Sequence, residues 1–295
     1  MPIPEAQLET WSHQGSVTQS SSTYNTIKSV LENSTTPYAG KKFEVFLQGS
    51  YGNSTNIYAE SDVDIVIQLD DCFHRDLSML TAAEKALYWS AFPDTAIYTD
   101  VDFKRDVLSV LKEQYGSAVK AGDKAIAIDG SGSRRKADVI VAIQFRRYLK
   151  FRSSNDFEFV EGICFRNGSG ELISNYPKQH SANLTKKHQN TSEWFKPTVR
   201  VFKNIRSQMV DKGLIKSGIA PSYYIEGLLY NVPDGKLANS YNDSVVNTLN
   251  WYLQEASKTN LLCANKQQYL LKDGCWNQAN CDVFVEAAVK FWNLW

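Results

Sequence analysis

The sequence lacks the features by which a chain enters or crosses a membrane. No stretch is long and apolar enough to span a bilayer, so we expect no membrane partner. The N-terminal segment MPIPEAQLETW has neither a basic start nor an apolar centre, so we expect no signal peptide. These absences predict a cytoplasmic protein.

Cysteine is scarce and its spacing fits no zinc-binding template. The chain has an odd number of cysteines: Cys72, Cys164, Cys263, Cys275 and Cys281. A metal site made from the last three is an alternative that this spacing leaves open. We expect reduced thiols instead, as is usual in the cytosol.

An excess of charge of either sign is also absent, because 32 Lys and Arg balance 32 Asp and Glu. Proteins that bind long nucleic acids are usually basic in at least one domain. The balance therefore favours small nucleotides as substrates. With 295 residues, 43% of them hydrophobic, the chain can form one large or two modest domains with a true core.

The most informative stretch lies between residues 43 and 68. Alternating apolar residues 43–47 predict a strand that ends at the turn Gly49-Ser50, and Asp62 and Asp64 later open a second apolar run. On a strand, residues i and i+2 leave the same face, so the two carboxylates would repel unless a divalent cation neutralised them. The turn offers N–H groups and a hydroxyl to a phosphate. Together these features predict nucleotidyl transfer.

Either feature alone is weak, since Asp-x-Asp at a strand end is commonly a solvated edge. The order strand, Gly-Ser, short polar helix and Asp-x-Asp strand is more specific, and it resembles the nucleotidyltransferases of the DNA polymerase β type. Gly49-Ser50-Tyr51-Gly52-Asn53 and Ser61-Asp62-Val63-Asp64-Ile65-Val66 look most like the cGAS/DncV-like nucleotidyltransferases. These are bacterial relatives of cyclic GMP-AMP synthase and oligoadenylate synthetase. The resemblance runs from about Lys41 to Leu229.

The chain departs from related proteins in two places. Tyr51-Gly52-Asn53 does not follow the Gly-Thr ending of many polymerase-β-like turns, which puts phosphate contacts beyond Ser50 in question. No zinc-binding insertion like that of the animal cyclic GMP-AMP synthase is evident, which favours a compact bacterial form.

A third carboxylate, Asp138, stands near the start of the apolar run 137–143. An acid at this place is usually a solubilising residue at the edge of a strand. The resemblance implies instead that Asp138 completes a metal site with Asp62 and Asp64. The expected cofactor is a pair of Mg²⁺ ions, which Mn²⁺ could replace.

The second half of the chain carries further candidates for nucleotide binding. Lys196, Arg200 and Lys203 follow one side of a predicted helix, which commonly means a solvated basic face. The resemblance implies that Lys203 contacts the triphosphate, and the other two are weaker candidates.

Ser222 and Tyr223 follow Pro221 at a predicted helix start, where a hydroxyl can bind phosphate and an aromatic ring can stack on a base. The alternative is an N-cap serine followed by a core tyrosine. The resemblance assigns both residues, with Gly49 and Ser50, to the nucleotide. We expect Glu226 to support the fold and His180 to be structural.

The expected fold is α+β. It has a polymerase-β-like core with a mixed sheet, residues 1–180 including an N-terminal helix, and then an oligoadenylate-synthetase-like helical domain, residues 181–295, that completes the nucleotide-binding cleft. A single helix is expected before about residue 41. A capping box from Thr81 to Glu84 is expected to start another helix, and Asn167-Gly168 is expected to close a hairpin.

The resemblance implies a metal-dependent enzyme in which a ribose hydroxyl attacks the α-phosphate of a nucleoside triphosphate and pyrophosphate leaves. Repetition would close a cyclic di- or trinucleotide second messenger, with ATP among the expected substrates. The family commonly acts in bacterial anti-phage signalling of the CBASS type. This implies a separate effector protein that reads the product, and a regulatory protein or RNA as a candidate activator.

Two alternatives stay open at the level of sequence. One is an enzyme that makes a linear oligoadenylate or modifies another molecule. The other is a module that senses nucleotides or RNA without turnover, using Arg134-Arg135-Lys136, Arg146-Arg147, Lys150 and Arg152. The bases used, the ring size and the linkage are not determined by the sequence.

Overall fold

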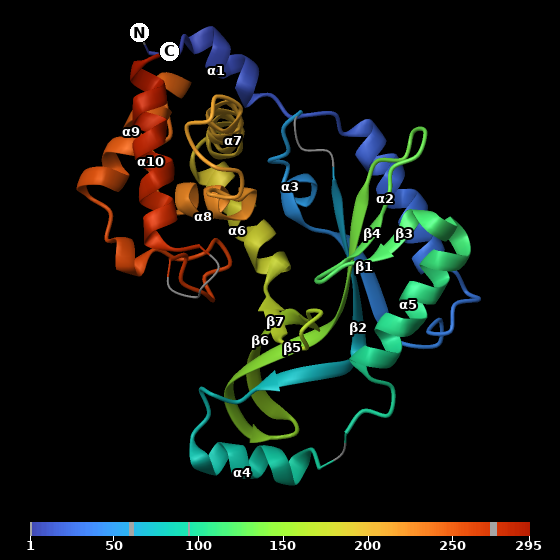
Figure 1. Cartoon of the computed structure of the whole chain (residues 1–295). Coiled ribbons are helices and arrows are strands. Elements are labelled where there is room, and N and C mark those ends of the chain that lie inside the picture. The colour runs from blue at the N-terminus through green and yellow to red at the C-terminus, as the bar shows by residue number, and fades with distance from the viewer. Residues whose placement is uncertain (1, 59–61, 94, 272–275) are drawn as a thin grey trace. The chain divides into compact units, whose positions relative to one another are not determined.

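The computed structural model describes residues 2–58, 62–93, 95–271 and 276–295 (Figure 1). The chain forms two compact units. We call residues 18–48 and 62–177 the sheet unit, and residues 1–17, 49–61 and 178–295 the helical unit. Ser61 of the predicted motif and Cys275 of the alternative cysteine site lie outside the described residues.

The sheet unit is built on a mixed sheet with the strand order β1-β2-β5-β4-β3, in which β6 also pairs with β5, and β7 with β6. Among the described strands, β2 and β5 run parallel and the other pairs run antiparallel. The strands are β1 Phe43–Leu47, β2 Val63–Asp76, β3 Val119–Ala121, β4 Ile126–Ile128, β5 Ala137–Ser153, β6 Asp156–Arg166 and β7 Leu172–Asn175.

The parallel pair forms the buried centre of this sheet. Val63, Ile65 and Ile67 of β2 are fully buried, and so is Val139 of β5. A near-continuous apolar run is what a strand covered on both faces requires. The apolar runs in the sequence therefore predict these strands, but both strands extend beyond them.

Helices α2 (Thr18–Leu31) and α5 (Asp100–Tyr115) pack against each other and against β2 (Figure 1). In α5 the fully buried residues Phe103, Val107 and Leu111 recur every four residues, which puts them on one face. Helix α4 (Ala82–Ala91) packs on β5. It begins with the predicted capping box of Thr81 and Glu84, which is confirmed.

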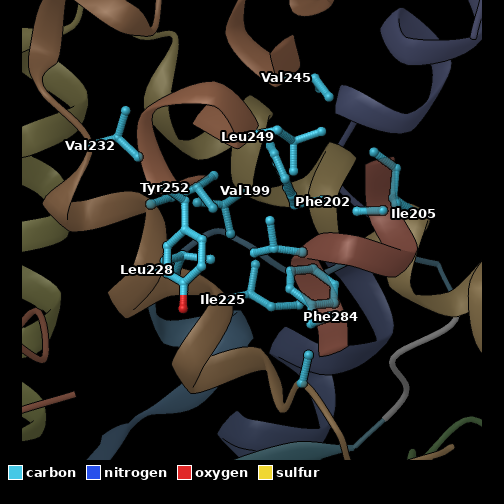
Figure 2. Packing of buried hydrophobic residues seen from close by; sticks show 14 of the residues in the cluster. Val199, Phe202, Ile205, Ile225, Leu228, Val232, Val245, Leu249, Tyr252 and Phe284 are labelled. Carbon is cyan, nitrogen blue, oxygen red and sulfur yellow. The ribbon is translucent and has the colours of Figure 1, made fainter. Parts of the chain in front are cut away.

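The helical unit has its own apolar core. Its helices are α1 Glu5–Ser12, α3 Gly49–Gly52, α6 Pro177–Asn190, α7 Phe195–Asp211, α8 Ser222–Asn231, α9 Tyr241–Gln254 and α10 Gln278–Asn293. Figure 2 shows side chains from α7 to α10 meeting in this core, among them Val199, Phe202, Ile205, Ile225, Leu228, Val245, Leu249, Tyr252 and Phe284.

The prediction of a single N-terminal helix is wrong, because α1 and α2 are separate and belong to different units. The chain leaves the helix around Gly15, whose N–H donates to the Asn56 carbonyl at 3.1 Å. A β-carbon on Gly15 would lie 2.7 Å from the Ile57 carbonyl group. The close backbone approach therefore requires glycine and interrupts the helix. Within the described ranges, every helix is too short or too polar to cross a membrane.

Candidate active site

Two of the predicted carboxylates face each other across the parallel strands. Asp64 of β2 is the register partner of Asp138 of β5, and Asp62 stands one residue before β2. The N–H of Val63 donates to the Lys136 carbonyl at 3.0 Å and fixes the pairing at the strand ends. In-register neighbours leave the same face of a sheet, so the fold brings Asp64 and Asp138 together.

Asp138 is the second residue of β5, which lies between β2 and β4 inside the sheet. Asp138 is half-buried, and burial raises the pKa of its carboxyl above the ordinary value. The Lys136 ammonium opposes this rise in pKa, while the Asp62 carboxylate adds to it. A carboxyl that is costly to ionise here would gain from a nearby cation.

A positive charge already accompanies Asp62. The Nζ atom of Lys136 lies 2.6 Å from Oδ2 of Asp62, and the two side chains are 45% and 41% exposed. This hydrogen bond raises the pKa of Lys136. The carboxylate oxygens of Asp62, Asp64 and Asp138 are the type of metal ligand that Mg²⁺ prefers. Among the described residues, however, no three Asp, Glu, His or Cys side chains are already gathered into a metal-binding cluster.

The Gly-Ser turn forms the predicted short helix, α3. Gly49 has a φ of 65°, a left-handed conformation that glycine adopts without strain. The turn is closed by hydrogen bonds from the Asn53 N–H to the Gly49 carbonyl at 3.0 Å and from the Thr55 N–H to the Ser50 carbonyl at 2.9 Å.

Lys203 contacts the Gly-Ser turn directly. Its Nζ donates to Ser50 Oγ at 2.7 Å and lies 3.3 Å from both Thr55 Oγ1 and Glu226 Oε1. Because Lys203 is fully buried, the solvated-face interpretation is wrong for this residue. Arg200 contacts the segment that follows the turn, because its Nη1 donates to the Ser54 carbonyl at 2.6 Å.

Glu226 lies at the centre of this cluster and is only 2% exposed. Oε2 accepts from Asn53 Nδ2 at 3.1 Å and lies 2.8 Å from His180 Nε2, and Oε1 accepts from the Thr55 hydroxyl. Burial raises the pKa of Glu226, but the Lys203 charge, then His180 and Thr55, outweigh it and lower the pKa to about 2. Glu226 is therefore a carboxylate at neutral pH. We call Asn53, Thr55, His180, Lys203 and Glu226 the buried network.

Sequence reasoning did not assign Glu226 or His180 to the site. The available signal was an acid within the apolar run Ile225–Leu229, one helical turn after Tyr223. His180 offered no such signal, because it meets Glu226 only through the tertiary fold.

Ser222 and Tyr223 are the first two residues of α8, the helix that also carries Glu226. The N-cap interpretation of Ser222 is wrong, because Pro221 occupies the cap and makes no side-chain cap hydrogen bond. Instead, Ser222 Oγ accepts from Arg206 Nη1 at 3.1 Å. The Tyr223 ring is stacked on His180, with centroids 4.6 Å apart, and its hydroxyl accepts from Asn265 at 3.0 Å.

The basic clusters proposed for RNA binding have partners within the sheet unit. Lys136 pairs with Asp62, and Arg147 and Lys150 pair with Asp76 and Asp156 at 3.1 and 3.0 Å. These pairs weaken the alternative of an RNA-sensing module, because carboxylates already neutralise part of the basic charge.

Known proteins resemble this chain over its whole length. Residues 182–293 match the family model of the cGAS/DncV-like nucleotidyltransferase C-terminal helical domain. A cyclic UMP-AMP synthase of Rhodothermus marinus is 39% identical over 100% of this chain and 99% of the relative. The chain belongs to the cGAS/DncV-like nucleotidyltransferases.

Two further comparisons agree with this assignment. The cyclic nucleotide synthase CdnE01 of Staphylococcus haemolyticus is 37% identical over 100% of both chains. The solved structure of Rhodothermus marinus CdnE c-UMP-AMP synthase with Apcpp and Upnpp matches with a TM-score of 0.89 at 38% identity, covering 100% of this chain and 98% of that one.

These findings confirm the predicted family, the α+β fold with its polymerase-β-like core, and the nucleotidyltransferase class. The predicted membership in a family of cyclic oligonucleotide synthases is confirmed as well. Nucleotidyltransferases of this family generally use divalent metal ions.

Proposed function

We propose that this enzyme joins two nucleoside triphosphates into a cyclic dinucleotide, with ATP and UTP as the leading substrates. The names of the Rhodothermus relative and its solved structure support this choice of bases. The structural observation that carries the proposal is the in-register pair Asp64 and Asp138, with Asp62 beside it in the chain.

In this proposal Asp62, Asp64 and Asp138 hold two Mg²⁺ ions, or Mn²⁺ in their place. When bound, the ions would stabilise negative charge on the attacking and leaving oxygens. The burial that raises the pKa of Asp138 supports this assignment, because a bound cation would offset the cost of its charge.

Gly49, Ser50, Lys203 and Ser222 would bind the triphosphate, and Tyr223 would stack on a base. The contact between Lys203 and Ser50 supports a shared role. A hydroxyl that accepts from an ammonium group becomes a better donor to a phosphate oxygen, because hydrogen bonds in a chain polarise one another.

Each transfer would form a bond between a ribose oxygen and the α-phosphorus while the bond to pyrophosphate breaks, and the hydroxyl proton would pass to solvent. A second transfer on the linear intermediate would close the ring. We further propose a cytoplasmic location, a role in anti-phage signalling with a separate effector, and activation by a protein or RNA. The predicted boundary between residues 180 and 181 stays part of this proposal.

The test is to incubate the purified enzyme with the four nucleoside triphosphates and Mg²⁺ or Mn²⁺, treat with phosphatase, and identify products by chromatography and mass spectrometry. The proposal predicts a phosphatase-resistant product that contains AMP and UMP and has one water less than its linear form. A product that phosphatase degrades would instead favour linear oligonucleotides.

A further inference from the structure

We infer that Glu226 is a positioning residue, whose buried carboxylate holds the Ser50–Lys203 pair in the arrangement that binds a triphosphate. This inference rests on the proposed function and adds a residue to it. Glu226 would act through Lys203 and the segment 53–55.

The position of Glu226 needs an explanation, because a buried carboxylate is costly unless it is paired and hydrogen-bonded. Four side chains meet this requirement: Asn53 and Thr55 from the segment after α3, His180 from α6 and Lys203 from α7. A buried ion pair need not stabilise a fold more than apolar side chains of similar volume would. Stability alone therefore does not account for this arrangement.

The partners of Glu226 point to the phosphate-binding turn. Asn53 and Thr55 directly follow α3, whose Ser50 accepts from Lys203. Between them, Ser54 has a φ of 58°, a left-handed conformation that is strained in a residue with a side chain.

A strained residue persists where its surroundings fix it from several sides. Here Glu226 binds the side chains on both sides of Ser54, and Arg200 binds the Ser54 carbonyl. The carboxylate thus fixes both groups that would touch the phosphates: Lys203 by charge, and Ser50 through the turn.

Glu226 also contacts His180, on which the Tyr223 ring is stacked. Replacement by glutamine removes the charge that faces Lys203 but keeps atoms that can hydrogen-bond to His180. We therefore expect Glu226→Gln to weaken binding of the triphosphate while leaving base stacking nearly intact.

The experiment measures the affinity for the α,β-methylene analogue of ATP and for AMP, both with Mg²⁺. The variants are Glu226→Gln and Thr55→Val, which removes the hydroxyl between Glu226 and Lys203 but keeps the ion pair. Glu286→Gln, an exposed acid of α10, controls for the lost charge. Thr248→Val controls for the lost hydroxyl, because within the described residues its buried Oγ1 has no hydrogen-bond partner.

For Glu226→Gln we expect at least about a tenfold loss of affinity for the triphosphate and less than about a threefold loss for AMP, a difference of roughly 0.7 kcal/mol or more. Thr55→Val should lower the ratio of the triphosphate affinity to the AMP affinity by a smaller factor. Both controls should leave this ratio unchanged. A purely structural role would lower both affinities equally, because a smaller folded fraction affects both ligands alike.

An unchanged ratio of the two affinities in a folded Glu226→Gln or Thr55→Val protein would overturn the inference. If Glu226→Gln does not fold, Thr55→Val decides alone. Binding is read without turnover, so the two proposals can fail separately. If the wild type forms no cyclic product while Glu226→Gln still loses triphosphate affinity selectively, the proposed function fails and the inference stands.

Discussion

One lysine–carboxylate pair from each compact unit belongs to the candidate site, and these two pairs lie in opposite environments. In the sheet unit, Lys136 and Asp62 are 45% and 41% exposed. In the helical unit, Lys203 and Glu226 are 0% and 2% exposed, and Glu226 has three further hydrogen-bond partners. A metal ion could therefore replace the Lys136 ammonium beside the exposed Asp62. The charge of the buried Glu226 is instead balanced by Lys203 inside the protein.

This difference indicates two ways of using carboxylates in one enzyme. Asp62, Asp64 and Asp138 lie where metal ions could reach them, and burial opposes the ionisation of Asp138. Glu226 is kept ionised by the protein itself, since its pKa is lowered to about 2. In the proposed function the first group takes part in the chemistry, and in the further inference Glu226 positions other residues.

The largest expected effect is on turnover in Asp64→Asn. Loss of a metal carboxylate removes several kcal/mol of transition-state stabilisation, so the rate of pyrophosphate release should fall by at least about a thousandfold. The circular dichroism spectrum and thermal unfolding should stay close to those of the wild type. Pyrophosphate release near the normal rate would show that the carboxylates of the sheet unit do not take part in the chemistry.

The next effect is on stability in Glu226→Ala. Removing one partner of a buried ion pair leaves Lys203 as an uncompensated buried charge, which typically costs about 3–5 kcal/mol. Denaturant unfolding followed by tryptophan fluorescence measures this loss. Glu286→Ala, an exposed acid of the same unit, should change stability by less than about 0.5 kcal/mol. Equal effects in the two variants would show that Glu226 is not a buried ion-pair partner.

In the absence of metal ions, Asp138→Asn is expected to increase stability, by less than Glu226→Ala decreases it. The pKa of Asp138 is raised in the folded state, so its contribution to stability is complete below the ordinary pKa of 3.8 and is lost as pH rises through the folded pKa. At pH 7 the ionised group is a cost, and asparagine should therefore stabilise the protein slightly.

The gain in Asp138→Asn should disappear in unfolding curves recorded below pH 3.8. With Mg²⁺ and nucleotide present, the wild type should become the more stable of the two, because the cation then binds the carboxylate. A variant that is less stable than the wild type at pH 7 without metal would contradict this account.

The smallest effect is expected for Lys136→Met. Exposed ion pairs contribute about 0.2–1 kcal/mol, so its stability should fall by no more than this. Salt screens such pairs, and the difference should shrink towards zero in 1 M NaCl, where the screening length is about 3 Å. A loss as large as that in Glu226→Ala would mean that the two pairs do not differ as the structure indicates.

The parts of the site that could be predicted from the sequence are local in the chain. The turn at Gly49-Ser50 and the strand after Asp62 follow from spacing and turn chemistry, and the family resemblance predicted Asp138 as a partner of Asp62 and Asp64. The buried network could not be predicted in this way, because Glu226 meets Thr55 across 171 residues and His180 across 46. From the sequence alone, a glutamate in an apolar helix indicates an acid that needs a partner, but not which residue that partner is.

The fold, too, was predicted where its signals are local in the sequence. Sequence signals located the start of α4, the parallel strands and the hairpin over Asn167-Gly168, whose strands are β6 and β7. The break between α1 and α2 was missed, because Gly15 is required by contact with Ile57, a residue distant in sequence. The capping box of Thr99 and Asp102, which begins α5, was also missed, although both residues are visible in the sequence.

We propose that the carboxylates of the sheet unit and the buried network of the helical unit serve the same reaction in different ways. The most direct test is the steady-state kinetics of cyclic product formation from ATP and UTP by the wild type, Asp64→Asn and Thr55→Val. The account predicts a loss of kcat in Asp64→Asn of at least about a thousandfold. For Thr55→Val it predicts a KM for ATP that rises several-fold while kcat changes by less than about threefold. A Thr55→Val enzyme with an unchanged KM and a reduced kcat, or an Asp64→Asn enzyme with near-normal kcat, would contradict it.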